Sequence, residues 1–300
     1  MAPVHTIYVI CGPTAVGKSA VAMDVAARVG TAIISADSRQ CYKSMDIGTA
    51  KPSIAERTAI DHYFVDEFPF TQNITAAGYE ALALGYLDKI FTTHNTAVVC
   101  GGTGLYIKAL CEGLDAMPAI DTKIDEQVNE QYKEKGIAWL QHAVKENDPL
   151  FYTQGEIQNP MRLIRALVFK LSTGESITTY RTGIKKARPF KIIKVGLELP
   201  REELNLRINK RVDVMMNEGL LDEVKQLHPY KDLKNLQTVG YSELFDYLEG
   251  NYSLEEAVLK IKQNTRHYAK RQMTWFKKEK DVIWFNANEH NLAEQILLLK

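Results

Sequence analysis

The sequence predicts an α/β protein in which a parallel β-sheet is flanked by helices and an all-helical domain is inserted. Two observations support this prediction. Over about the first hundred residues, short apolar strands alternate with helical segments, as in parallel sheets with helical crossovers. Between residues 115 and 187 only amphipathic helical patterns occur. We therefore expect a core in two parts, residues 1–114 and 188–300, separated by a helical domain of residues 115–187.

Four strands are expected from runs of apolar and β-branched residues. They span residues 6–11, 31–35, 97–100 and 192–197. In an open parallel sheet, ligands bind at the carboxyl ends of the strands. We therefore expect the functional residues to follow these strands in the chain.

The expected helices differ between the two parts of the chain. In the core, a helix begins near Lys18 and follows the first strand directly. In the inserted domain, the apolar periodicity predicts helices over residues 123–134, 137–146 and 160–172. We expect the last of these helices to end at Gly174, because glycine readily adopts the left-handed conformation at a helix terminus.

The segment after the first strand fits the phosphate-binding pattern G-x-x-x-x-G-K-[ST]. Its glycines let successive backbone N–H groups point inward, and the next helix presents its positive N-terminal end. Lys18 can reach terminal phosphates, and the Ser19 hydroxyl can ligate Mg²⁺. The motif predicts a P-loop NTPase-like fold with Mg²⁺ as cofactor. The residues expected to hold phosphates are Gly12, Pro13, Thr14, Ala15, Val16, Gly17, Lys18 and Ser19.

Polar residues follow the second strand in the order Asp37, Ser38, Arg39, Gln40. The Asp37 carboxylate could accept a proton from an attacking amine or hydroxyl, or hold Mg²⁺ through water. It could also simply cap a turn or a helix. The residues alone leave these roles open.

The third strand ends in a glycine-rich segment, Gly101–Gly104. Such a segment allows a ligand to approach the backbone closely, with the Thr103 hydroxyl as a donor. The alternative is a tight turn between strand and helix that binds nothing.

Two arginine pairs have the spacing that places both side chains on one helix face. Arg162 and Arg165 lie in the predicted insert and suit phosphates or stacked bases, although surface ion pairs are an equal alternative. Arg207 and Arg211 lie in the second part of the core and could neutralise a leaving diphosphate.

The 300-residue chain has 37 basic and 37 acidic side chains, so its net charge gives no case for a nucleic-acid partner. The distribution is less even. Residues 262–280 hold seven basic residues, including Lys270 and Arg271, against one acidic residue, and residues 181–194 hold six basic residues and no acidic one. Two such clusters in a neutral chain favour a polyanionic partner.

Composition also excludes several classes of protein. No apolar run approaches the length that crosses a bilayer, and residues 1–30 do not resemble a secretion signal. The four cysteines lack the spacing of a zinc site or a disulfide framework. We therefore expect a cytoplasmic protein with reduced thiols and no membrane partner.

Over nearly its whole length the chain resembles the bacterial tRNA dimethylallyltransferases. The blocks that carry the resemblance are Gly12–Ser19, Ser35–Gln40, Met45–Pro52, Gly101–Tyr106, Arg162–Leu167, Gly240–Tyr241 and Ala269–Phe276. The resemblance implies transfer of a dimethylallyl group from dimethylallyl diphosphate to N6 of the adenosine immediately 3′ of the anticodon, with release of diphosphate. It also implies that the helical insert grips the anticodon stem-loop. We expect the enzyme to act as a monomer.

The resemblance implies roles for individual residues. Asp37 takes the proton of the attacking amine, Lys18 and Ser19-bound Mg²⁺ stabilise the departing diphosphate, and Thr103 touches the diphosphate or the reacting centre. Arg207 completes the diphosphate clamp. The residues expected to contact tRNA are Asp37, Ser38, Arg39, Gln40, Met161, Arg162, Leu163, Ile164, Arg165, Lys270 and Arg271. Met161 departs from the glutamine that the family commonly has at this place.

Three other functions are compatible with parts of the sequence. A small-molecule or nucleotide kinase would use the same phosphate loop and carboxylate, and would consume ATP without RNA. An isopentenyltransferase that acts on free adenine nucleotides would share the chemistry. An RNA-binding switch would bind a nucleotide without consuming it. The basic clusters and the segment from Asp37 to Gln40 favour the tRNA enzyme.

Overall fold

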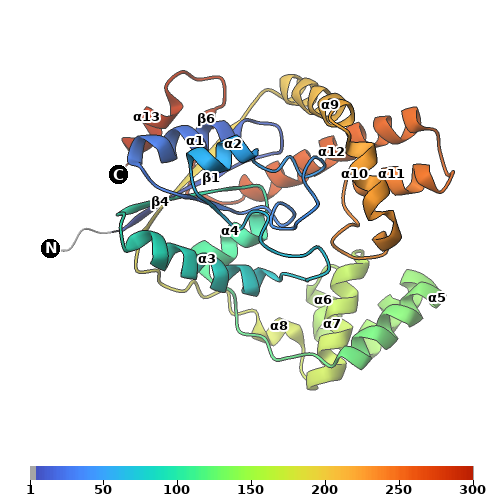
Figure 1. Ribbon diagram of the computed structural model, residues 1–300. Helices are drawn as coiled ribbons and strands as arrows, with labels where there is room; N and C mark the ends of the chain where they lie inside the picture. The colour runs from blue at the N-terminus through green and yellow to red at the C-terminus, as the bar shows by residue number, and fades with distance from the viewer. Residues whose placement is uncertain (1–4, 300) are drawn as a thin grey trace. The chain divides into compact units, whose positions relative to one another are not determined.

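The computed structural model describes residues 5–299 (Figure 1). They include a six-stranded parallel sheet with the strand order β3-β2-β4-β1-β5-β6. The strands are β1 (Thr6–Cys11), β2 (Ile33–Ser35), β3 (His62–Tyr63), β4 (Thr96–Gly101), β5 (Lys191–Glu198) and β6 (Val282–Asn286). The four predicted strands are confirmed as β1, β2, β4 and β5. The edge strands β3 and β6 were not predicted.

Helices cover both faces of the sheet, and β1 shows how the sequence produces this arrangement. Its side chains alternate between the two faces, as strand geometry requires. Val9 is buried in a cluster with residues of α3 (Ala76–Phe91) and α4 (Gly104–Glu112). Ile10 is buried in a second cluster with residues of α1 (Lys18–Val29) and α13 (Leu292–Leu297). Burial on both faces explains why the central strands read as continuous apolar runs.

The chain divides into two compact units. One contains the residues up to Glu112 and those from Ala187 onward, and the other is Gly113–Lys186. The predicted boundaries of the insert were residues 115 and 187. The first unit contains the sheet and the helices α1, α3, α4, α13, α2 (Ile54–Ala59), α9 (Arg201–Asn217), α10 (Leu220–Leu227), the 3₁₀ helix η1 (His228–Tyr230), α11 (Tyr241–Leu248) and α12 (Leu254–Phe276).

The second unit is all-helical, with a core of its own. Its helices are α5 (Thr122–Asn147), α6 (Pro149–Gln154), α7 (Pro160–Thr173) and α8 (Ile177–Tyr180). The predicted helices 123–134 and 137–146 form the two halves of α5. Gly136 lies between them and interrupts the helix with φ 73° and ψ −171°. Gly174 ends α7 in the left-handed conformation, as predicted. Among residues 5–299, no helix combines the length and apolar character that a bilayer crossing requires.

Two of the six residues in one of the basic clusters, Arg188 and Lys194, have a structural role. The Arg188 side chain is 8% exposed and donates to Leu110 O and Ala109 O at 2.8 Å each and to the Glu80 carboxylate at 2.8 Å. Lys194 is 5% exposed, and its Nζ lies 3.0 Å from the Asp281 carboxylate. The prediction that the cluster at residues 181–194 marks a polyanionic partner is therefore corrected at these two positions, because local charge in the sequence does not reveal burial.

Candidate functional site

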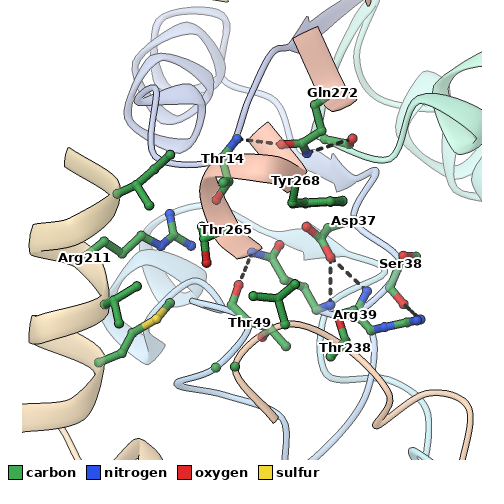
Figure 2. Close-up of a pocket in the computed structure, with 18 of the residues that line it drawn as sticks. Thr14, Asp37, Ser38, Arg39, Thr49, Arg211, Thr238, Thr265, Tyr268 and Gln272 are labelled. Atoms are coloured by element: carbon green, nitrogen blue, oxygen red, sulfur yellow. Dashed lines mark hydrogen bonds between the residues drawn. The ribbon is translucent and has the colours of Figure 1, made fainter. Parts of the chain in front are cut away.

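A cavity of about 240 Å³ lies in the first unit, where the loops that follow β1, β2 and β4 meet helices α9 and α12 (Figure 2). The strand-end loops contribute Thr14, Asp37 and Gly102 to its wall, and the helices contribute Arg211 and Tyr268. This is the sheet edge at which the sequence predicted the site. The order of strands brings these loops together because β1 and β2 both pair with β4.

The phosphate loop has the backbone that its sequence predicts. Gly12 adopts a φ of 143°, and a Cβ there would lie 2.5 Å from Leu197 O, so no larger residue fits. Lys18 Nζ donates to Pro13 O at 2.7 Å. Burial lowers the pKa of the Lys18 ammonium, and the charge of Arg211 acts in the same direction. Of the eight predicted phosphate-binding residues, Thr14, Lys18 and Ser19 line the cavity.

Asp37 caps a turn, which is one of the alternative roles expected from the sequence. Its carboxylate also faces the cavity. Its Oδ1 accepts hydrogen bonds from the backbone N–H groups of Arg39 at 2.8 Å and Gln40 at 3.3 Å. Within the described chain, no protein group donates a hydrogen bond to Oδ2. The turn therefore orients the carboxylate and leaves one oxygen for a ligand.

Thr103 joins two loops behind the cavity. Its Oγ1 accepts a hydrogen bond from Ser38 N at 3.1 Å, and its backbone N–H donates to Ala36 O at 3.1 Å. Gly101 makes this approach possible, because a Cβ there would lie 2.3 Å from the Ala36 carbonyl. Thr103 itself is not part of the cavity wall that the described residues form. The glycine-rich segment thus brings the ends of β2 and β4 together, and this role does not depend on a ligand.

The Gln40 side chain lines the cavity and has protein partners already. Its Nε2 donates to Ala50 O at 3.0 Å and Thr49 O at 3.3 Å, and its Oε1 accepts from the Ser35 hydroxyl at 3.2 Å. Arg39 also lines the cavity, and its Nη1 donates to Ser38 O at 3.1 Å. Gln40 therefore holds the neighbouring loop in place as well as facing the cavity.

The two arginines of α9 differ in their surroundings. Arg207 was the predicted diphosphate ligand, yet its Nη2 donates to Asn288 at 2.6 Å and to Glu203 at 2.9 Å. Arg211 lines the cavity, and no described residue accepts a hydrogen bond from its guanidinium. Burial lowers the pKa of Arg211, against the attraction of Asp37. A cation with no partner in a cavity suits an anionic ligand, so Arg211 is the better candidate.

Tyr268 of α12 was not predicted as a site residue. It lines the cavity beside Asp37, and burial together with the Asp37 charge raises the pKa of its phenol to about 12 (Figure 2). The phenol therefore keeps its proton at neutral pH and can donate a hydrogen bond. In the sequence, Tyr268 stands at helical spacing among other aromatic residues, and no local motif distinguishes it from a core residue. The same cavity also has an apolar wall, formed by Ile208, Val212, Met215, Leu220, Val239 and Ile261.

The predicted tRNA-binding residues of the insert fall into two groups. Met161, Arg162 and Arg165 are exposed on α7. Leu163 and Ile164 are buried in the core of the insert, with exposed fractions of 0% and 4%. A contact of these two side chains with RNA is therefore corrected, since the side chains hold α7 in its own unit.

A third arginine lies beside the exposed pair in the same unit. Burial lowers the pKa of Arg181, and the charges of Arg165 and Arg162 lower it further. Arg181 therefore lies close enough to Arg162 and Arg165 to be repelled by their charges. A polyanion would relieve this repulsion.

The basic segment of α12 is only partly available to a partner. Lys270 and Arg271 are exposed, as the prediction requires. In contrast, Lys262 pairs with Asp213, and Lys277 pairs with Glu198 at 2.7 Å. Arg266 donates to Asn209 at 2.7 Å. The excess of positive charge read from the sequence is thus reduced by partners from other elements.

The donor set for a metal ion is small. Among residues 5–299, no three His, Cys, Asp or Glu side chains gather in the way a protein-only metal site needs. Ser19 and Asp37 both line the cavity. A hydroxyl with a nearby carboxylate fits Mg²⁺ that takes its other ligands from phosphates and water.

The fold and the cavity define a P-loop protein in which a carboxylate, an unpaired arginine and an apolar wall surround a phosphate-binding loop. Residues 40–279 match the family model described as IPP transferase. The chain belongs to this family.

Individual relatives agree with this assignment. The chain is 43% identical to the tRNA dimethylallyltransferase of Cytophaga hutchinsonii, over 94% of this chain and 93% of the relative. It is similar to the crystal structure of the tRNA isopentenylpyrophosphate transferase from Bacillus halodurans, with a TM-score of 0.71, 33% identity and coverage of 98% and 93%. A eukaryotic dimethylallyltransferase acting on tRNA shares the fold, with a TM-score of 0.76 at 24% identity, over 98% of this chain and 78% of that one.

Proposed function

We propose that this protein transfers a dimethylallyl group from dimethylallyl diphosphate to N6 of the adenosine immediately 3′ of the anticodon in tRNA, and releases diphosphate. One observation carries the proposal beyond family membership. A single cavity joins the phosphate loop, the unpaired Arg211, an apolar wall and the open oxygen of Asp37. These are the groups needed for a diphosphate, a short hydrocarbon and an amine.

The reaction follows from the positions of these groups. The adenine amine attacks the allylic carbon C1, and the bond from C1 to the bridging oxygen of the diphosphate breaks. Asp37 accepts the proton that leaves N6. Lys18, Arg211 and the amides of the phosphate loop stabilise the negative charge on the departing diphosphate. The apolar wall holds the five-carbon group away from water.

The proposal includes Mg²⁺ as cofactor. The ion would neutralise charge on the diphosphate, with the Ser19 hydroxyl as its protein ligand. We expect removal of divalent ions by a chelator to abolish transfer and added Mg²⁺ to restore it. Full activity in the presence of a chelator would contradict this role.

The proposed RNA contacts come from both units. Arg162 and Arg165 in the insert, and Lys270 and Arg271 on α12, are exposed cations suited to the phosphate backbone. The target base leaves its stack to reach Asp37, with Ser38 and Arg39 beside it. We further propose that the enzyme acts as a monomer in the cytoplasm, and light scattering of the purified protein tests the first point.

The decisive experiment supplies labelled dimethylallyl diphosphate and an unmodified anticodon stem-loop with adenosine 3′ of the anticodon. Parallel reactions contain free AMP, or ATP alone as a test of hydrolysis. We expect label on the stem-loop only. Label on AMP would indicate an enzyme that acts on free nucleotides, and consumption of ATP without transfer would indicate a kinase.

A further inference from the structure

The Gln272 side chain connects the phosphate loop to the glycine-rich segment after β4. It projects from α12, is 6% exposed, and uses both ends of its amide. Its Oε1 accepts a hydrogen bond from Thr14 N at 2.8 Å, and its Nε2 donates to Gly102 O at 3.0 Å (Figure 2). One neutral side chain therefore joins backbone groups of two loops and the helix above them.

The surroundings of this amide are specific to glutamine. A Cβ at Gly102 would lie 2.1 Å from Gln272 Nε2, so the absence of a side chain there leaves room for the amide. Glutamate has the same length but cannot donate to Gly102 O while it is ionised. Methionine has a similar volume and forms neither of the two hydrogen bonds. The position thus requires a side chain of glutamine length that provides one acceptor for Thr14 N and one donor for Gly102 O.

The connection continues to the proposed base. Thr103, next to Gly102, donates through its backbone to Ala36 O at 3.1 Å and accepts from Ser38 N through its hydroxyl at 3.1 Å. Ala36 and Ser38 flank Asp37 on both sides. Hydrogen bonds, together with the peptide bond between Gly102 and Thr103, therefore connect the phosphate loop through Gln272 to the turn that carries the carboxylate.

We propose that Gln272 is a positioning residue that sets the distance between the diphosphate on the phosphate loop and the carboxylate of Asp37. This inference rests on the proposed prenyl transfer. The reaction needs the amine held by Asp37 and the allylic carbon next to the diphosphate to lie about 3–3.5 Å apart, and a misplacement of 1 Å costs about a hundredfold in rate. Looser loops would still bind both substrates while aligning them less often.

A direct contact with RNA is the competing explanation, because Gln272 lies next to Lys270 and Arg271 in the same sequence block. The structure favours positioning. Lys270 and Arg271 are exposed on α12, whereas the Gln272 amide is buried and has both polar ends occupied by backbone groups. The two explanations differ in whether substitution weakens the binding of tRNA.

The test compares Gln272→Met and Gln272→Glu with the same substitutions at Gln263, which is exposed on the same helix. Single-turnover transfer to the anticodon stem-loop gives the rate, and separate titrations give the affinities for dimethylallyl diphosphate and for the stem-loop. For Gln272→Met we expect a rate lowered about 10- to 100-fold, with both affinities within about threefold of the wild type. The Gln263 variants should keep the wild-type rate.

Gln272→Glu adds a readout that general destabilisation does not give. The ionised glutamate repels Gly102 O, whereas the protonated form restores a donor. The ratio of its rate to the wild-type rate should therefore rise as the pH falls from 8 toward 5. If Gln272→Met does not fold, this ratio together with the affinity of Gln272→Glu for the stem-loop decides the same question: a rate that recovers at low pH with an affinity that stays near the wild-type value supports positioning.

Two results would overturn the inference while leaving the proposed function intact. One is a Gln272→Met enzyme that keeps the wild-type rate. The other is a loss of rate matched by an equal loss of affinity for the stem-loop, which would indicate an RNA contact. Failure of the wild-type protein itself to transfer the label would instead overturn the proposed function.

Discussion

At the scale of single residues, Asp37 combines two uses of one carboxylate. One oxygen caps the turn at Arg39 and Gln40, and the other remains open to the cavity. From the sequence alone, a turn and a catalytic base are alternative roles for Asp37, but the structure is compatible with both because a carboxylate has two oxygens. The turn fixes the orientation in which the open oxygen would meet the amine.

Replacing Asp37 by alanine should remove the proton acceptor and leave the phosphate loop unchanged. We expect the rate of transfer to fall by about two to four orders of magnitude, since positioned general bases contribute about that much, with little change in diphosphate affinity. Single-turnover transfer measures the rate, and Asp24→Ala, a change at an exposed ion pair on α1, serves as the control. Near-full activity of Asp37→Ala would reassign the base.

Arg211 and Arg207 offer a second comparison between residues on one helix. Arg211→Ala removes the unpartnered cation of the cavity and should weaken binding of dimethylallyl diphosphate about 10- to 100-fold, as expected for one or two charge-assisted hydrogen bonds. Arg207 is already engaged by Glu203 and Asn288, so Arg207→Ala should change the affinity less than about threefold. Calorimetric titration of each variant gives both affinities. A larger effect at Arg207 would support Arg207 as the diphosphate ligand, as the resemblance implies.

At the scale of elements, the accuracy of prediction depended on the range of the contacts involved. The P-loop, β1 and α7 were predicted correctly because their signals are local: a motif, an apolar run, and a glycine at the helix end. Gln272 and Thr14 are 258 residues apart, and no local pattern announces their contact. Arg188 and Lys194 read as surface charges for the same reason, since their partners come from other elements. The edge strand β3 has two residues and thus no period to detect.

Gly136 illustrates how one backbone position shapes an element. Its φ of 73° and ψ of −171° lie in a region that is essentially restricted to glycine. Nothing lies within 4 Å of where a Cβ would be. Gly136→Ala should therefore destabilise the insert by about 1–3 kcal/mol through backbone strain alone. Chemical denaturation measures this, and Gly174→Asn, at a left-handed position that asparagine tolerates, should cost less.

At the scale of the whole molecule, the two units carry different parts of the proposed task. The cavity lies entirely within the first unit, whereas the arginine cluster of α7 and Arg181 lies in the second. The chemistry and part of the RNA grip can therefore be altered separately. This separation distinguishes a loss of chemistry from a loss of tRNA binding.

The double variant Arg162→Ala, Arg165→Ala should weaken binding of the anticodon stem-loop and leave binding of dimethylallyl diphosphate unchanged. If each arginine neutralises one phosphate, the plot of log affinity against log salt should become shallower, with a negative slope smaller in magnitude by about 1–2 units. Fluorescence titration at several salt concentrations measures it. The matched control is Lys123→Ala, at the first turn of α5. An unchanged slope would contradict a backbone contact by this pair.

Arg188 has a consequence for how such a chain accommodates an extra domain. The insert leaves the core after α4 and returns just before Arg188, which is bonded to the carbonyls of Ala109 and Leu110 at the end of that helix. Arg188 thus holds together the two core segments between which the inserted domain lies. Because the entropic cost of a closed loop grows only slowly with its length, the inserted domain can lengthen or shorten with little effect on the free energy of the sheet. An inserted domain at this junction can therefore be changed in evolution, or replaced by design, with little loss of stability in the core.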